Sequence, residues 1–303
     1  MARNPIILGC AWGDYLSAQR ASLPYLPDIE DLTDRVTRIM GGNPGEMQLQ
    51  GTNTYLIGTG NSRILIDTGQ GVPTWATNIT RLLRERNLTI SHILLTHWHG
   101  DHTGGVPDLI EYDPSLASRV YKNRPSPGQL PIKHGQIFRT EGATIRAIFT
   151  PGHAVDHMCF HLVEENALFT GDNVLGHGYS VAEDLAEYMR SLEIMQRQGC
   201  EIGYPAHGIK IVDLPRTIRL YIRQKKHREH QIYQALVQVK GGLTTRQMVQ
   251  TLHGDIPEEL FADAFEPFLN ESLSKLAEER KVGFQISKGK RRWFLNRRAW
   301  DSL

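Results

Sequence analysis

The chain has 303 residues, of which 40% are hydrophobic, and its formal net charge is +1, so it can bury a substantial core. It contains no run of 18 apolar residues and no secretory signal, and we expect a cytoplasmic protein with no role for a membrane. Its three scattered cysteines exclude a disulfide framework and a C-x-x-C metal site.

The charge is unevenly distributed. Residues 1–215 hold 17 Lys and Arg against 23 Asp and Glu, a net charge of −6. Residues 216–303 hold 17 against 10, a net charge of +7. The two parts are therefore predicted to meet different partners.

In chain order, the first predicted elements are short helices within residues 11–32, in an N-terminal extension (1–45) that packs on the core. A central domain (46–215) then alternates strands and helices, which predicts an α/β sandwich. Its expected elements are strands within 47–60 and 62–69, a helix at 73–87, strands at 91–96, 144–150, 157–162 and 166–170, a helix at 180–198 and a short strand within 200–208.

A C-terminal module at 216–303 begins with a long basic amphipathic helix, 216–239, and continues with two helical stretches and two strands. This order resembles a small winged-helix module. Its last segment, SKGKRRWFLNRR, would bind nucleic acid through its cations and aromatic rings, or form a solvated wing with Trp293 and Phe294 in the core. We prefer the second interpretation.

The most informative stretch is LLTHWHGDHTGG, residues 94–105, which follows a buried strand. It places His97, His99, Asp101 and His102 in the pattern H-x-H-x-D-H, in a chain with 13 histidines. Burying four such groups without a charge partner would be costly, so a bound dication is the simplest explanation.

Three further groups follow predicted strands: His153 in TPGHAVDH, Asp172 in LFTGDNVLG and His207 in YPAHG. With the cluster they provide five histidines and two aspartates, enough for two metal ions. These ligands favour two Zn²⁺, with manganese or iron as alternatives. Two dications lower the pKa of a shared water from 15.7 towards about 7, which predicts a hydrolase with Asp101 as general base.

The order of these motifs resembles the metallo-β-lactamase superfamily over about residues 45–215, which implies an αββα sandwich. The resemblance implies these metal ligands: His97, His99 and His153 for the first ion, Asp101, His102 and His207 for the second, and Asp172 for both. It also implies that Asp67 in ILIDTG supports the histidine loop. The commonest zinc lactamases of the superfamily have a cysteine at the position of Asp172, which argues against β-lactam hydrolysis and leaves thioesters, phosphodiesters and other esters.

A closer resemblance, spanning nearly the whole chain, is to fungal polyketide-pathway thioesterases of the atrochrysone carboxyl ACP thioesterase type. It includes the motifs GGNPGEMQLQGTNTYLIGTG and FTPGHAVDHMCFHL. It implies hydrolysis of an aromatic polyketide thioester on the acyl carrier domain of a non-reducing polyketide synthase. A thiolate with a pKa near 8.5 can leave without a general acid, and the basic C-terminal module would dock an acidic carrier domain.

Two alternatives stay open: a lactamase-β-like endoribonuclease that cuts single-stranded RNA, and a glyoxalase II-like hydrolase of small thioesters. His177 and Tyr179, close behind Asp172, are expected to support the metal ligands or to contact the substrate. Trp12 and Tyr15 line an acyl pocket or, preferably, pack in the core.

Overall fold

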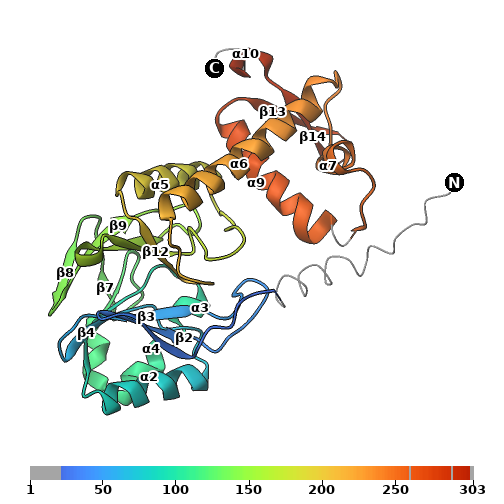
Figure 1. Ribbon diagram of the computed structural model, residues 1–303. Coiled ribbons are helices and arrows are strands. Elements are labelled where there is room, and N and C mark those ends of the chain that lie inside the picture. Colours follow the sequence, from blue (N-terminus) through green and yellow to red (C-terminus); the bar gives the residue numbers. More distant parts are fainter. Residues whose placement is uncertain (1–21, 259–260, 288, 301–303) are drawn as a thin grey trace. The chain divides into compact units, whose positions relative to one another are not determined.

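The computed structural model describes residues 22–258, 261–287 and 289–300. The described chain forms two compact units (Figure 1): a first unit from residues 22–183 and 187–219, and a C-terminal unit from residues 184–186 and from 220 onwards. The domain boundaries at residues 45 and 215 stay a prediction. Within the described residues, none of the helices has both the length and the apolar composition that crossing a bilayer requires.

The first sheet of the first unit has seven strands in sequential order. They are β1 (Ile29–Thr33), β2 (Val36–Met40), β3 (Asn53–Ile57), β4 (Ser62–Ile66), β5 (Thr89–Leu94), β6 (Val120–Lys122) and β7 (Leu130–Pro131). Neighbours from β1 to β4 are antiparallel, and those from β4 to β7 are parallel. Strand β5 is central, with Ile93 and Leu94 fully buried, and it leads directly into the histidine motif.

The second sheet has five strands in the order β12-β11-β10-β9-β8. They are β8 (Ile137–Thr140), β9 (Ala143–Phe149), β10 (Met158–Leu162), β11 (Ala167–Gly171) and β12 (Ile202–Pro205). All neighbours are antiparallel except β11 and β12, which are parallel. The ends of β11 and β12 therefore lie side by side, and each is followed by a predicted metal ligand.

The two sheets share a core, in which Tyr55 of the first sheet contacts Phe169 of the second with ring centroids 5.0 Å apart. Helices α2 (Pro73–Glu85) and α4 (Val106–Tyr112) cover the other face of the first sheet, where Trp75, Ile79 and Leu82 repeat at helical spacing. Helix α5 (Leu185–Arg197) lies beyond the second sheet (Figure 1). The layers follow the order αββα, so the predicted sandwich is confirmed. Three short elements connect these layers: α3 (Gly100–Thr103), η1 (Pro114–Arg119) and η2 (Val163–Glu165).

The C-terminal unit contains most of α6 and a hairpin among smaller helices. Its elements are α6 (Leu214–Val237), α7 (Thr245–His253), the π-helix η3 (Phe261–Phe265), α9 (Glu266–Glu278), β13 (Val282–Ser287), β14 (Lys290–Leu295) and α10 (Arg297–Trp300). Helix α7 begins with a capping box between Thr244 and Gln247. A separate core, which includes Met248, Leu273 and Trp293, joins the helices to the hairpin.

Three details of the sequence prediction are wrong within the described residues. Residues 29–32, at the end of the segment expected to form short helices, belong to strand β1, because they pair with β2 along the sheet. The helix expected from residue 180 begins only at Leu185, since the preceding segment is a loop next to the predicted ligands. Trp293 is buried in the core as expected, but Phe294 is 39% exposed, because successive residues of a strand face opposite sides.

Candidate metal centre

Seven predicted ligands come together at one end of the sandwich. Each follows a strand: the histidine motif follows β5, and His153, Asp172 and His207 follow β9, β11 and β12. The short helix α3 begins after His99, and it carries Asp101 and His102 back towards the other ligands. We call these seven side chains, of residues 97, 99, 101, 102, 153, 172 and 207, the His/Asp cluster.

The cluster divides into two groups, within each of which all the ligand atoms lie within 4.8 Å of one another. The first group contains His97, His99, His153 and Asp172. Its closest nitrogen atoms are His97 Nε2 and His99 Nδ1, 2.9 Å apart, while His153 Nε2 lies 3.2 Å from His99 Nδ1. Three imidazole nitrogens that converge in this way can share one ion.

The second group contains Asp101, His102 and His207. His207 Nε2 lies 3.4 Å from Asp101 Oδ2, and His102 Nε2 lies 3.6 Å from the same oxygen. Two nitrogens and one carboxylate oxygen thus face one point, and together they could bind a second metal ion.

Asp172 lies between the groups. Its Oδ1 is 3.2 Å from His207 Nε2 in the second group, and its Oδ2 is 3.5 Å from His153 Nε2 in the first group. Oδ2 is also 3.5 Å from His102 Nε2. A carboxylate in this position can bind an ion in each group, which is the bridging role that the resemblance implied.

The other ring nitrogens of the histidines contact groups outside the cluster. His102 Nδ1 lies 2.9 Å from Asp67 Oδ2, and His97 Nδ1 lies 2.9 Å from Thr96 Oγ1. His153 Nδ1 lies 2.8 Å from the carbonyl oxygen of Val181. Such contacts orient the rings and keep the inward nitrogen of each histidine free to bind a metal.

Two atoms of the cluster test whether a metal fits. His102 Nε2 and Asp172 Oδ1 are buried, and neither has a hydrogen-bond partner among the described residues. A buried polar atom without a partner is costly, and a cation would satisfy Asp172 Oδ1 directly and His102 Nε2 once that nitrogen has lost its proton. Nitrogen and carboxylate donors are typical zinc ligands, so the residues fit a divalent ion.

The pKa values show how strongly the groups of the cluster interact. Burial alone would lower the pKa of His102 and His207, but nearby carboxylates, above all that of Asp172, hold the first well above its usual range and raise the second to about 9. Burial alone would raise the pKa of Asp101. The hydrogen bond with His207 and the charge of His102 outweigh burial and lower this pKa to about 2. A divalent ion would therefore displace protons from the two histidines while Asp101 stays ionised.

Two residues near the cluster were missed by the sequence analysis. His157 is fully buried, and its Nε2 accepts a hydrogen bond from the backbone N–H of Asp172 at 3.1 Å, which holds the backbone of Asp172 in place. Gln48 Nε2 donates to Asp101 Oδ2 at 3.4 Å. His157 could have been noticed, because it is the second histidine of the motif TPGHAVDH. No feature of the sequence pointed to Gln48.

The other predicted site residues lie at different distances from the cluster. The structure brings Asp67 into contact with it, as described. His177 is half-buried in a loop that is tied to the cluster by a hydrogen bond from Gly176 N to His207 O, 2.9 Å long. Tyr179 is exposed on the same loop, shortly before the Val181 carbonyl that faces His153. Roles for His177 and Tyr179 stay predictions, and Trp12 and Tyr15 lie outside the described residues.

Large apolar side chains are exposed on the loops that hold the cluster. Trp98 stands between two histidines of the cluster, is 50% exposed, and has its ring centroid 4.4 Å from that of His99. Its backbone N–H donates to Asp156 Oδ1 at 3.3 Å, and Asp156 Oδ2 accepts from Lys122 Nζ at 2.8 Å in a buried ion pair. Met47, Val155, Tyr179 and Val181 are further exposed apolar side chains close in sequence to residues that contact or form the cluster.

Comparison with known proteins agrees with this geometry. The family model of the metallo-beta-lactamase superfamily matches residues 48–207. The chain belongs to this superfamily. Membership and the His/Asp cluster together identify a divalent-metal site in a metallo-beta-lactamase superfamily enzyme, as the motifs predicted.

Related members of the superfamily match over nearly the whole chain. Lactamase-like protein nscB of Aspergillus fumigatus is 59% identical over 93% of this chain and 90% of its own length. Atrochrysone carboxyl ACP thioesterase of Aspergillus chevalieri is 54% identical over 96% of this chain and 97% of its own length. A crystal structure of a beta-lactamase domain protein from Burkholderia ambifaria is 16% identical, covers 90% of this chain and 95% of its own, and has a TM-score of 0.72, which shows a shared fold.

Proposed function

We propose that this protein is a thioesterase that hydrolyses an aromatic polyketide thioester carried by the acyl carrier domain of a non-reducing polyketide synthase, and so releases the free acid. The observation that carries the proposal is the pair of possible ligand groups, with Asp172 between them, in a chain 54% identical to an atrochrysone carboxyl ACP thioesterase. The exposed ring of Trp98, next to His99, is suited to contact with an aromatic acyl group.

Two zinc ions are the proposed cofactors. His97, His99 and His153 would hold the first, Asp101, His102 and His207 would hold the second, and Asp172 would contact both. When bound, the ions would supply an activated water and polarise the thioester carbonyl.

Asp101 has the position and charge of a general base. Its pKa of about 2 keeps it ionised at neutral pH, and Gln48 contacts the same carboxylate oxygen that faces His102 and His207. It would receive the proton lost by the attacking water. The leaving thiolate needs no protonation at the moment of C–S cleavage, because its pKa is near 8.5.

The test offers the purified, metal-loaded protein three substrates in parallel: a carrier-bound aromatic polyketide thioester, a single-stranded RNA and a small glutathione thioester. We expect release of the free acid, detected by mass spectrometry, and its loss in His97→Ala and Asp172→Ala variants. Cleavage of RNA by the wild type, faster than any thioester hydrolysis and lost in the same variants, would refute the proposal in favour of an endoribonuclease. Hydrolysis of small glutathione thioesters only would favour a glyoxalase II-like enzyme.

A further inference from the structure

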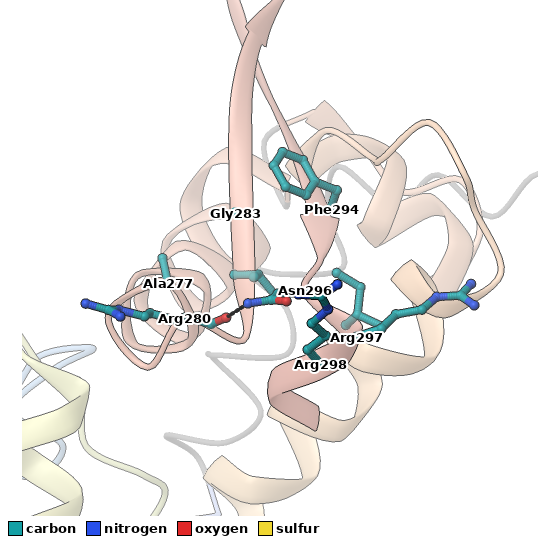
Figure 2. A pocket seen from close by; sticks show the side chains of 9 residues that line it. Ala277, Arg280, Gly283, Phe294, Asn296, Arg297 and Arg298 are labelled. Atoms are coloured by element: carbon teal, nitrogen blue, oxygen red, sulfur yellow. Dashed lines mark hydrogen bonds between the residues drawn. The ribbon is translucent and has the colours of Figure 1, made fainter. Parts of the chain in front are cut away.

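The C-terminal unit contains a groove of about 610 Å³ at the base of its hairpin. We call it the arginine groove; it is lined by Ala277, Val282, Gly283, Phe294, Leu295, Asn296 and three arginines, Arg280, Arg297 and Arg298. Figure 2 shows Arg280 and Arg297 on opposite sides of the groove, with Phe294 on the hairpin strand. Among the residues that the structure describes, no Asp or Glu lines it.

The backbone around the groove is held by Asn296. Its Nδ2 donates to the carbonyl oxygen of Arg280 at 2.7 Å, and its N–H donates to the carbonyl oxygen of Lys281 at 2.9 Å. Arg280 has a φ of +59°, in the left-handed region, which turns the chain from α9 into β13. The arginines from the end of α9 and the start of α10 are thereby brought to one place.

The apolar part of the groove is exposed by the hairpin register. Gly283 pairs with Phe294, and a Cβ at Gly283 would lie 2.8 Å from the Phe294 ring. The ring therefore lies against the glycine, and it remains 39% exposed beside the buried side chain of Val282. The groove thus combines an aromatic side chain with guanidinium groups.

Most of the described carboxylates that form ion pairs in this unit pair with cations outside the groove. Glu271 pairs with Lys225 at 2.9 Å, and Glu279 pairs with Lys275 at 2.6 Å and with Lys281 at 2.8 Å. Neither Arg280 nor Arg298 forms an ion pair with any residue that the structure describes. From residue 280 to residue 300 the chain has eight Lys and Arg and no Asp or Glu.

We propose that the arginine groove docks an acidic amphipathic helix of the carrier domain that delivers the thioester. Carboxylates of such a helix would pair with the guanidinium groups, which bind carboxylates in two-pronged hydrogen bonds, and an apolar side chain would pack on Phe294. This inference rests on the proposed function, because it takes the partner to be the carrier domain. Charge complementarity of this kind determines association rate and specificity.

The test measures binding without turnover. The phosphopantetheinyl carrier domain of the synthase from the same pathway, without an acyl group, is titrated against wild-type protein, an Arg280→Glu/Arg298→Glu variant and an Arg223→Glu/Lys226→Glu control. The control reverses two exposed cations of α6 that do not line the groove, so both variants change the net charge equally. We expect the groove variant to bind at least about tenfold more weakly, the control to stay within about twofold of wild type, and wild-type binding to weaken with salt.

Unchanged binding by the groove variant, or equal loss in both variants, would overturn the docking proposal. So would tight binding of a single-stranded RNA that only the groove variant loses, since the groove would then serve nucleic acid. The proposed function is measured separately with a small free thioester, which needs the metal centre alone. If the protein hydrolyses that thioester but fails the binding test, the docking proposal is refuted and the proposed thioesterase function stands. If it binds the carrier domain selectively but hydrolyses no thioester, the proposed function is refuted and the docking proposal stands.

Discussion

Replacing Asp67 by Asn tests whether this buried carboxylate supports metal binding. Asp67 is 1% exposed, its Oδ1 accepts a hydrogen bond from the backbone N–H of Thr96 at 2.8 Å, and its Oδ2 lies 2.9 Å from His102 Nδ1. Its φ of +57° lies in the left-handed region, which Asn adopts as readily as Asp. The Asp67→Asn variant should therefore keep the local backbone.

The size of the effect follows from the hydrogen bonds. An Asn can still accept from Thr96 with its oxygen, but its NH₂ group then faces His102 Nδ1. A histidine that binds a metal through Nε2 carries its proton on Nδ1, so two donors would meet and the bond would be lost. A hydrogen bond to a charged group is worth about 1.5–3 kcal/mol, which corresponds to roughly 10- to 150-fold in metal affinity.

The assay is competition of the protein with a zinc chelator of known affinity, for wild type, Asp67→Asn and a Glu271→Gln control. Glu271 is also a buried carboxylate, paired with Lys225 in the C-terminal unit, so its loss should lower stability without weakening zinc binding. Circular dichroism confirms that each variant is folded. If Asp67→Asn bound zinc within about threefold of wild type, or if the control lost as much affinity, the assigned role of Asp67 would be wrong.

Four further predictions concern the cluster and its surroundings. Elemental analysis of protein purified without chelators should give close to two metal equivalents per chain, and active protein with a reproducible value below one would exclude two ions. Zinc binding at pH 7 should release protons, because the pKa of His207 in the metal-free protein is about 9; apparent affinity should rise with pH up to that value, and pH-independent binding measured by calorimetry in two buffers would contradict this. The Asp101→Asn variant should still bind metal at His97, His99 and His153 but lose about 10²- to 10⁴-fold in turnover. Full activity of this variant would show that another group accepts the proton. Trp98→Ala should raise KM for an aromatic acyl thioester more than for an acetyl thioester, with Trp98→Phe close to wild type; equal effects on both substrates would remove Trp98 from acyl recognition.

The metal ligands could be predicted from the sequence because each stands directly after a strand with a clear hydrophobic pattern. Four of them occupy six consecutive positions, so their proximity did not depend on the tertiary fold. The groups around them were harder to find. Gln48 reaches Asp101 across 53 positions, and His157, at the start of a predicted strand, contacts the backbone of Asp172, which lies 15 positions later in the chain.

The strands near both edges of the first sheet were missed for a physical reason. β6 and β7 have three and two residues, too short for an alternating pattern to show, and they are held by pairing with longer neighbours. The first two strands follow a proline-rich segment that resembled helix boundaries, and only pairing along the sheet reveals them as strands. Local sequence preferences therefore described the centre of each sheet better than its edges.

In the basic C-terminal segment, the register of the β13–β14 hairpin decides which aromatic side chain lies beside the cations. Its cations were visible in the sequence, but whether they would surround an aromatic side chain depended on which of two adjacent aromatics turned inward. The pairing of Val282 with Leu295 places Trp293 in the core and Phe294 in the arginine groove. A shift of one residue would exchange the two faces, bury Phe294 and turn Trp293 outward. The composition thus gave the positive charge of the surface, whereas the hairpin register determined that this charge lies beside an apolar contact site of the kind that a protein helix can use.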